Sequence, residues 1–187
     1  MQDLRSHLER CLRGRLCLMG LGSIECGDDG FGIRLAEALR EIAVDRPGSE
    51  GVSVVVAGTS PERFVGQVVQ EGADHLIFLD AVDISAPPGA VTVMETGEMG
   101  LRFPQVSTHR LSLGLLSRWV EGAGDTKAWL VGVQPVSLRP SRRLTPPVEA
   151  ALEVLRATMR DVVLSRRSER ARSGRLAAPA ARVVVTL

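Results

Sequence analysis

The sequence predicts an α/β protein, a three-layer α/β/α arrangement around a mostly parallel, twisted sheet of about five strands. Two observations support this fold class. Apolar segments of strand length recur along the chain with helical patterns between them, and several of these segments read as strands buried on both faces. Strands that alternate with helices favour a parallel sheet, because right-handed crossovers place the helices on its two faces.

The chain begins with a predicted amphipathic helix, since Leu4, Leu8 and Leu12 share one face. We assign residues 1–14 to this leader helix and residues 15–165 to one α/β domain, a length that suits a single hydrophobic core. Within the domain, the predicted strands are 15–21, 52–57, 75–79, 90–94 and 127–133, and the predicted helices are 30–44, 61–71, 109–121 and 146–165.

The sequence also predicts the direction of one strand, the start of the last helix and the nature of the chain end. Strand 90–94 is the candidate antiparallel strand, because only the short segment AVDISAPPG links it to the strand before it. The last helix begins at Pro146 and Pro147, where a proline in the first turn loses no hydrogen bond. Residues 166–187 are basic and then rich in alanine and proline, which predicts a solvated, flexible tail.

Composition and charge exclude several classes of protein. The net charge of +1 gives no overall field to attract nucleic acid or anionic lipid. No apolar segment approaches the roughly 18 residues of a membrane span, and the N-terminus mixes charges where a signal peptide needs an apolar core. Cys11, Cys17 and Cys26 form no CxxC pair, which argues against a disulfide framework or a thiolate zinc site. We expect a cytoplasmic monomer that binds neither nucleic acid nor membrane.

The glycine-rich segment GLGSIECGDDGFG follows the first strand of the domain and opens its first helix. A dinucleotide fingerprint would need glycine at Glu25, where the sequence has a carboxylate, so a nucleotide-binding module is kept only as an alternative. Asp28 and Asp29 lie at the expected helix start, where a carboxylate can cap free backbone N–H groups. Two adjacent caps are redundant, so we expect capping from one of them and another role for the other.

Asp80 and His109 are the further candidates for a site. Asp80 follows an apolar strand directly, at the edge where α/β sheets bind ligands, although an aspartate there also serves as a turn-former. His7 lies in the leader helix and His75 at a strand start, on the opposite edge. His109, at the expected start of a helix, is therefore the preferred imidazole, with a structural role as its alternative. Gln134, at a strand end, either binds an extended peptide or simply ends the strand.

Two carboxylates and an imidazole at one edge of the sheet make a set of oxygen and nitrogen ligands for a divalent ion such as nickel, zinc or manganese. The ion would relieve the repulsion between the two acids. Three protein ligands leave coordination positions open, which suits recognition or catalysis better than a structural metal. Asp29, Asp80 and His109 are thus a candidate metal site.

Taken in order, these segments resemble the family of nickel-iron hydrogenase maturation endopeptidases. The glycine-rich segment is similar to the family pattern G-x-G-N-x-x-x-x-D-[DE]-G-x-G, except that Ser23 stands where the family usually has asparagine. A serine can still hydrogen-bond the backbone of the turn. The other matching segments are AGTSPE, FLDAVDISAPPG, STHRLSL, LVGVQP and LTPPVEAAL, and the resemblance covers about Leu16 to Leu164.

The resemblance implies an endopeptidase that removes a C-terminal extension from a hydrogenase large-subunit precursor after nickel insertion. The precursor is then the partner, and its nickel is supplied with the substrate rather than held as a resident cofactor. Hydrolysis is expected to be aspartic-type or metal-assisted, since no Ser-His-Asp or Cys-His arrangement stands out; a metallo-hydrolase with its own metal is an alternative. The implied catalytic and metal-contacting residues are Asp29, Asp80 and His109, and we assign substrate binding to Gly22, Gly58, Thr59 and Gln134.

Overall fold

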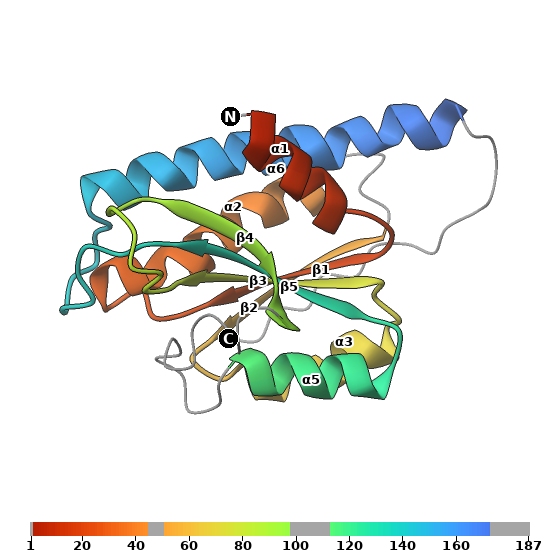
Figure 1. Ribbon diagram of the computed structural model, residues 1–187, viewed down its shortest axis with the longest axis horizontal. Coiled ribbons are helices and arrows are strands. Elements are labelled where there is room, and N and C mark those ends of the chain that lie inside the picture. Colours follow the sequence, from red (N-terminus) through yellow and green to blue (C-terminus); the bar gives the residue numbers. More distant parts are fainter. Residues whose placement is uncertain (1, 45–50, 98–112, 173–187) are drawn as a thin grey trace.

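The computed structural model of the chain describes residues 2–44, 51–97 and 113–172. A five-stranded sheet lies between two layers of helices, with α1, α2 and α6 on one face and α3 and α5 on the other (Figure 1). The strands are β1 (Leu16–Leu21), β2 (Val52–Gly58), β3 (His75–Ala81), β4 (Val91–Glu95) and β5 (Lys127–Val133). The helices are α1 (Gln2–Cys11), α2 (Phe31–Val44), α3 (Val65–Gln70), α5 (Leu113–Ala123) and α6 (Pro146–Arg172).

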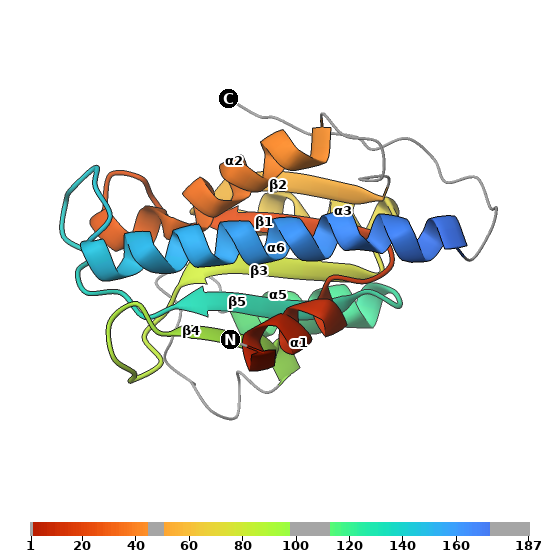
Figure 2. The same cartoon turned by 90° about the horizontal axis from the view of Figure 1, so that it is seen from above.

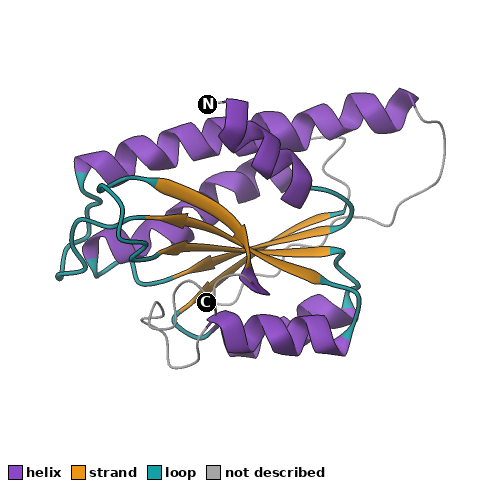
Figure 3. Cartoon of the chain, in the orientation of Figure 1, coloured by secondary structure: helices purple, strands orange, loops and turns teal. Residues whose placement is uncertain are grey.

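The sheet has the order β2-β1-β3-β5-β4. The pairs β1–β2, β1–β3 and β3–β5 are parallel, and β4 pairs with β5 in the antiparallel direction. The predicted fold class is confirmed, including the antiparallel strand. Figure 3 shows the strands as one layer with helices above and below it.

The hydrophobic core has two parts, one on each face of the sheet. All six residues of β1 are buried, and successive side chains point to opposite faces. Leu18 therefore packs toward α2 and α6, while Met19 packs toward α3 and α5. This burial on both faces explains why the central strands carry uninterrupted apolar segments.

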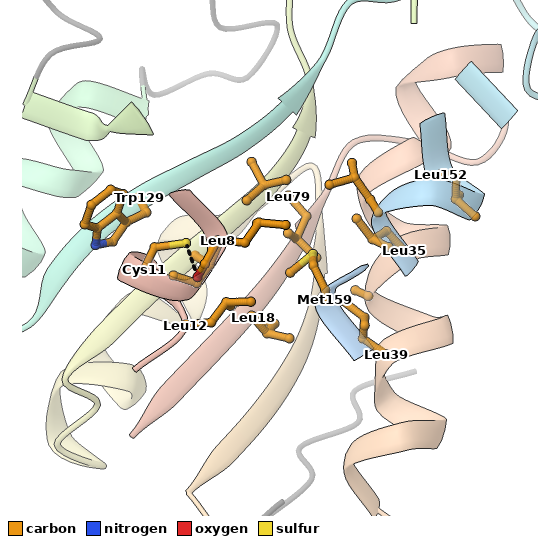
Figure 4. Packing of buried hydrophobic residues seen from close by; sticks show 14 of the residues in the cluster. Leu8, Cys11, Leu12, Leu18, Leu35, Leu39, Leu79, Trp129, Leu152 and Met159 are labelled. Atoms are coloured by element: carbon orange, nitrogen blue, oxygen red, sulfur yellow. Dashed lines mark hydrogen bonds between the residues drawn. The ribbon is translucent and has the colours of Figure 1, made fainter. Parts of the chain in front are cut away.

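Helix α1 packs across the sheet on the same face as α6 (Figure 2). Its residues Leu8 and Cys11 are fully buried, and the thiol of Cys11 donates a hydrogen bond of 3.4 Å to the carbonyl oxygen of Leu8 (Figure 4). Below them Trp129 of β5 is buried, with the guanidinium carbon of Arg10 5.9 Å from its ring centroid. The indole Nε1 of Trp129 donates to Nδ1 of His75 at 3.1 Å. The leader helix is thus part of the packed core.

Several elements differ from their predicted extents by a few residues, among them the following three. The predicted helix 61–71 is divided into a 3-10 turn, η2 (Pro61–Arg63), and the short helix α3. Strand β3 continues two residues beyond the predicted 75–79, so Asp80 lies within the strand rather than after it. Helix α6 continues past the predicted end at residue 165 to Arg172, because arginine and glutamate favour helix even in a strongly charged segment. The rest of the predicted tail, 173–187, lies outside the described residues.

Within the described ranges, no helix combines the length and the apolar character that crossing a membrane requires.

Candidate functional site

Two of the predicted site residues, Asp29 and Asp80, lie at the point where the connections of the sheet change direction. Strand β1 lies between β2 and β3, so the chain leaves β1 to one side of the sheet and later returns on the other. Open α/β sheets bind ligands at such a point, outside the carboxyl ends of the strands. Asp29 follows β1, and Asp80 is the penultimate residue of β3. Figure 2 shows the turn after β1 and the loops after β3 and β5 at the same end of the sheet.

Asp29 is held at this edge by a turn that folds back onto the end of β1. The turn includes the short 3-10 helix η1 (Gly27–Gly30), and Asp29 is buried within it. Gly22 has a φ of 99°, and a Cβ atom there would overlap the backbone carbonyl oxygen of Asp29. Only glycine therefore permits this approach, because it combines a positive φ with the absence of a side chain.

Asp80 is brought to the same edge by the close packing of α2 on β3. It is buried, and its Oδ1 accepts a hydrogen bond of 2.9 Å from the backbone N–H of Ala81. A Cβ atom on Gly32, in the first turn of α2, would overlap the carbonyl oxygen of Leu79. Gly32 follows Asp29 by three residues and Leu79 precedes Asp80, so the structure brings the two carboxylate-bearing segments together.

Asp28 has a role that the sequence did not predict. Capping was expected from one of the two adjacent acids; the N-cap residue of η1 is Cys26, and no side-chain hydrogen bond caps that end. The fully buried carboxylate of Asp28 instead binds the loop after β5. Its Oδ2 accepts hydrogen bonds from the backbone N–H groups of Val136 (2.8 Å) and Ser137 (3.1 Å) and from the hydroxyl of Thr145 (2.9 Å). Its Oδ1 accepts from the backbone N–H of Thr145 at 2.7 Å.

The predicted substrate-binding residues Gly22, Gly58 and Thr59 lie at adjacent strand ends. The backbone N–H of Gly22 donates to the carbonyl oxygen of Gly58 at 3.0 Å, and Thr59 is exposed next to it. Ser23, which departs from the family pattern, still hydrogen-bonds the turn: its hydroxyl accepts from the N–H of Glu25 at 3.4 Å. A contact of these residues with substrate stays a prediction.

Gln134 uses its side chain to hold the loop that follows β3. Its amide oxygen accepts hydrogen bonds from the backbone N–H groups of Ile84 (2.8 Å) and Ala86 (3.3 Å). Its backbone N–H donates to the carbonyl oxygen of Ala90 at 2.8 Å. The amide oxygen thus shapes the edge of the site, and the predicted contact of Gln134 with a bound peptide stays a prediction.

The predicted third ligand, His109, lies in residues 98–112, outside the described residues. The described part of the chain contains no group of three or more His, Cys, Asp or Glu side chains arranged to hold a metal. His75 lies at the start of β3, at the opposite end of the sheet, as expected. The meeting of His109 with Asp29 and Asp80 therefore stays a prediction.

The family model described as hydrogenase maturation protease matches residues 33–161. Among similar proteins, the hydrogenase 2 maturation protease of Escherichia coli is 32% identical over 143 residues, which cover 74% of this chain and 84% of that protein. The hydrogenase expression/formation protein HupD of Thiocapsa roseopersicina is 34% identical over 153 residues, covering 75% of this chain and 67% of that protein.

Solved structures show the same similarity. The [NiFe] hydrogenase maturation protease HycI from Thermococcus kodakarensis has a TM-score of 0.73 at 26% identity, covering 84% of this chain and 98% of that chain. The hydrogenase maturating endopeptidase HybD from Escherichia coli has a TM-score of 0.65 at 30% identity, covering 83% of this chain and 94% of that chain. Nearly the full length of each of these two proteins therefore corresponds to this fold.

Proposed function

Since the chain belongs to the hydrogenase maturation protease family, we propose that it cleaves a C-terminal extension from a hydrogenase large-subunit precursor and recognises the nickel bound to that precursor. The observation that carries this proposal is the pair of buried carboxylates, Asp29 and Asp80, on neighbouring segments at the edge where this fold binds ligands. In the proposal His109 provides the third contact with the metal.

The chemistry of the pair suits a metal that arrives with the substrate. Asp29 and Asp80 repel each other when both are ionised, and a divalent cation between them removes that repulsion. Carboxylate oxygens and an imidazole nitrogen are suitable ligands for nickel, and three protein ligands leave room for ligands from the precursor. An empty precursor offers no such contact, so cleavage would follow only after nickel insertion.

The nucleophile in this proposal is water. A carboxylate at the site can accept the proton of an attacking water molecule, and the side chain held nearest the scissile bond would do so. Nickel supplied by the precursor would act as a Lewis acid that polarises the scissile carbonyl. In this proposal Asp29 and Asp80 orient the precursor through its metal. Among the described residues, the buried carboxylates are these two and the loop anchor Asp28.

The test compares nickel-loaded with nickel-free precursor. Each form is incubated with the purified protein, and the size of the large subunit is followed by mass spectrometry. We expect cleavage of the nickel-loaded form alone. Cleavage of both forms at equal rates would refute nickel recognition while leaving the protease activity in place.

A second measurement addresses a hydrolase with a metal of its own. The metal content of the purified protein is determined before substrate is added. We expect less than one tightly bound ion per chain, because the precursor supplies the metal in this proposal. One tightly held ion per chain would favour the resident-metal enzyme instead. We further propose that the protein acts in the cytoplasm as a monomer, which cell fractionation and sedimentation velocity would test.

A further inference from the structure

Two loops beside the candidate site expose apolar side chains. Six large hydrophobic side chains are exposed in the part of the chain that the structure describes, and three of them lie on these loops. Ile24 is 43% exposed in the turn after β1, and Val136 and Leu138 are 51% and 40% exposed in the loop after β5. A group of exposed apolar side chains on neighbouring loops marks an interaction site more often than a single exposed apolar side chain does.

The two loops are fastened to each other by backbone hydrogen bonds. The N–H of Gly27 donates to the carbonyl oxygen of Ser141 at 2.7 Å, and the N–H of Ser141 donates to the carbonyl oxygen of Glu25 at 2.9 Å. The N–H of Asp28 donates to the carbonyl oxygen of Ser137 at 3.1 Å. The loop after β5 therefore lies along the turn that carries Asp29.

Side chains hold the same two loops from inside and from outside. The buried Asp28 carboxylate accepts its four hydrogen bonds from the loop after β5. At the surface Arg142 forms an ion pair of 2.9 Å with Glu25, and this guanidinium lowers the pKa of the Glu25 carboxyl. Loops fixed in this way lose little conformational entropy when a partner binds, which favours tight association.

The loop after β5 also carries positive charge. Arg139 and Arg143 are exposed on the loop after β5. The backbone N–H of Arg139 donates to the hydroxyl of Ser137 at 3.2 Å, and that of Arg143 donates to the hydroxyl of Ser141 at 3.0 Å. Arg142 is already paired with Glu25, so it adds no net charge to the surface. The chain as a whole has a net charge of only +1, so the two other arginines are a local feature. We call Ile24, Val136, Leu138, Arg139 and Arg143 the docking surface.

We propose that the docking surface binds a segment of the hydrogenase large-subunit precursor in which apolar side chains are flanked by acidic ones. This inference rests on the proposed function. Asp28, which holds the surface, is joined to Asp29 by a single peptide bond. A partner bound at the surface is consequently fixed relative to the candidate catalytic carboxylate, so that docking places the bond to be cut. The apolar side chains provide affinity, and the arginines steer the partner and select against basic surfaces.

The test uses the double variant Val136→Asp/Leu138→Asp, with Val154→Asp as a matched control. Val154 is 44% exposed on α6, similar to the two target residues, so none of these changes disturbs the core. Cleavage of the nickel-loaded precursor from the same organism is measured for each protein. We expect KM for the double variant to rise about tenfold to a hundredfold with kcat unchanged, and KM for the control to stay within about twofold of the unsubstituted protein.

The charges are tested separately with Arg139→Glu/Arg143→Glu. We expect the association rate with the precursor to fall about tenfold and its salt dependence to weaken, measured by surface binding at two ionic strengths. If the unsubstituted protein cleaves the precursor and the apolar double variant has the same KM as Val154→Asp, the docking inference is overturned and the proposed function stands. If the unsubstituted protein fails to cleave the precursor, both fail.

A second copy of this chain is the competing occupant of the surface. Sedimentation of the unsubstituted protein should give a monomer, and the double variant should give the same result. A dimer that disappears in the double variant would identify the surface as an interface between copies and would overturn the inference.

Discussion

The apolar face under α1 and α6 and the edge that carries Asp29 and Asp80 are built by different means. The apolar face consists of many contacts between mostly aliphatic side chains, and these contacts do not require the exact geometry of a hydrogen bond. The edge depends on a few close approaches of glycine to backbone and on one buried carboxylate with four hydrogen bonds. Because the proposed site lies at the edge and not on the apolar face, we expect stability and activity to depend on separate regions, so substitutions should divide into two groups.

The largest effect is expected at the edge. Asp80→Asn preserves the shape of the side chain but removes its charge, so cleavage of the precursor should fall by about 100-fold to 10,000-fold. The midpoint of thermal unfolding should change little. Asp83→Asn is the control, because Asp83 is exposed in the loop that follows β3. Cleavage by Asp80→Asn at more than about a tenth of the original rate would remove this carboxylate from the site.

The apolar face should show the opposite pattern. Leu8→Ala removes a fully buried side chain of α1 and should lower the free energy of unfolding by about 2–5 kcal/mol. The activity of the molecules that remain folded should be unchanged, since α1 lies away from the carboxylates. Val154→Ala, at an exposed position, should cost less than about 0.5 kcal/mol. Urea denaturation and cleavage assays on the same samples would show whether the two regions are separable.

A smaller effect is expected from the buried thiols. Burial raises the pKa of Cys11 and of Cys17 to about 12, from the ordinary value of 9.0. Below pH 9 both states of the protein keep the thiol protons. Above pH 9 the unfolded chain loses them while the folded chain retains them, so stability falls by up to about 1.4 kcal/mol per pH unit for each thiol until pH approaches 12.

The chain is well suited to this measurement, because it has no tyrosine and its single lysine is Lys127. Few other groups therefore titrate between pH 9 and 10.5. Urea denaturation of Cys11→Ala/Cys17→Ala should show a lower stability at pH 8 but a much flatter dependence on pH above 9. An unchanged slope in this variant would assign the alkaline loss to other groups.

The smallest effect is expected from the exposed ion pair between the two loops. Glu25→Gln removes the partner of Arg142, but the buried Asp28 still holds the loop after β5. Exposed ion pairs contribute little, so the midpoint of unfolding and the cleavage rate should both stay within experimental error. A clear loss of cleavage would mean that the surface pair, rather than the buried carboxylate, fixes the loops.

The sequence was sufficient to predict the sheet and its antiparallel strand. Continuous apolar segments such as 127–133 are local signals, because an interior strand with helices on both faces of the sheet is apolar along its length whatever its neighbours are. The placement of Asp80 was also predictable, because a strand end at the edge of a parallel sheet follows from chain direction alone. His109 lies outside the described residues, so this part of the predicted site stays open to experiment.

The role of Asp28 was not predictable in the same way. Its hydrogen-bond partners Val136 and Thr145 follow it by 108 and 117 residues, and only the folded chain brings them together. Capping was the expectation from local sequence, because aspartate is among the residues preferred at a helix N-cap. The segment LTPPVEAAL, which contains Thr145, belongs to the family resemblance and was the one signal for a contact of this kind.

The burial of Trp129 under helix α1 provides an optical reporter of that helix. Trp129 is buried beneath α1, whereas Trp119, the other tryptophan, is half exposed on α5. With no tyrosine in the chain, these two indoles dominate the ultraviolet emission. A quencher dissolved in water reaches Trp119 first, so the emission that remains comes from Trp129. Detachment of the leader helix would then be visible in real time without any attached dye.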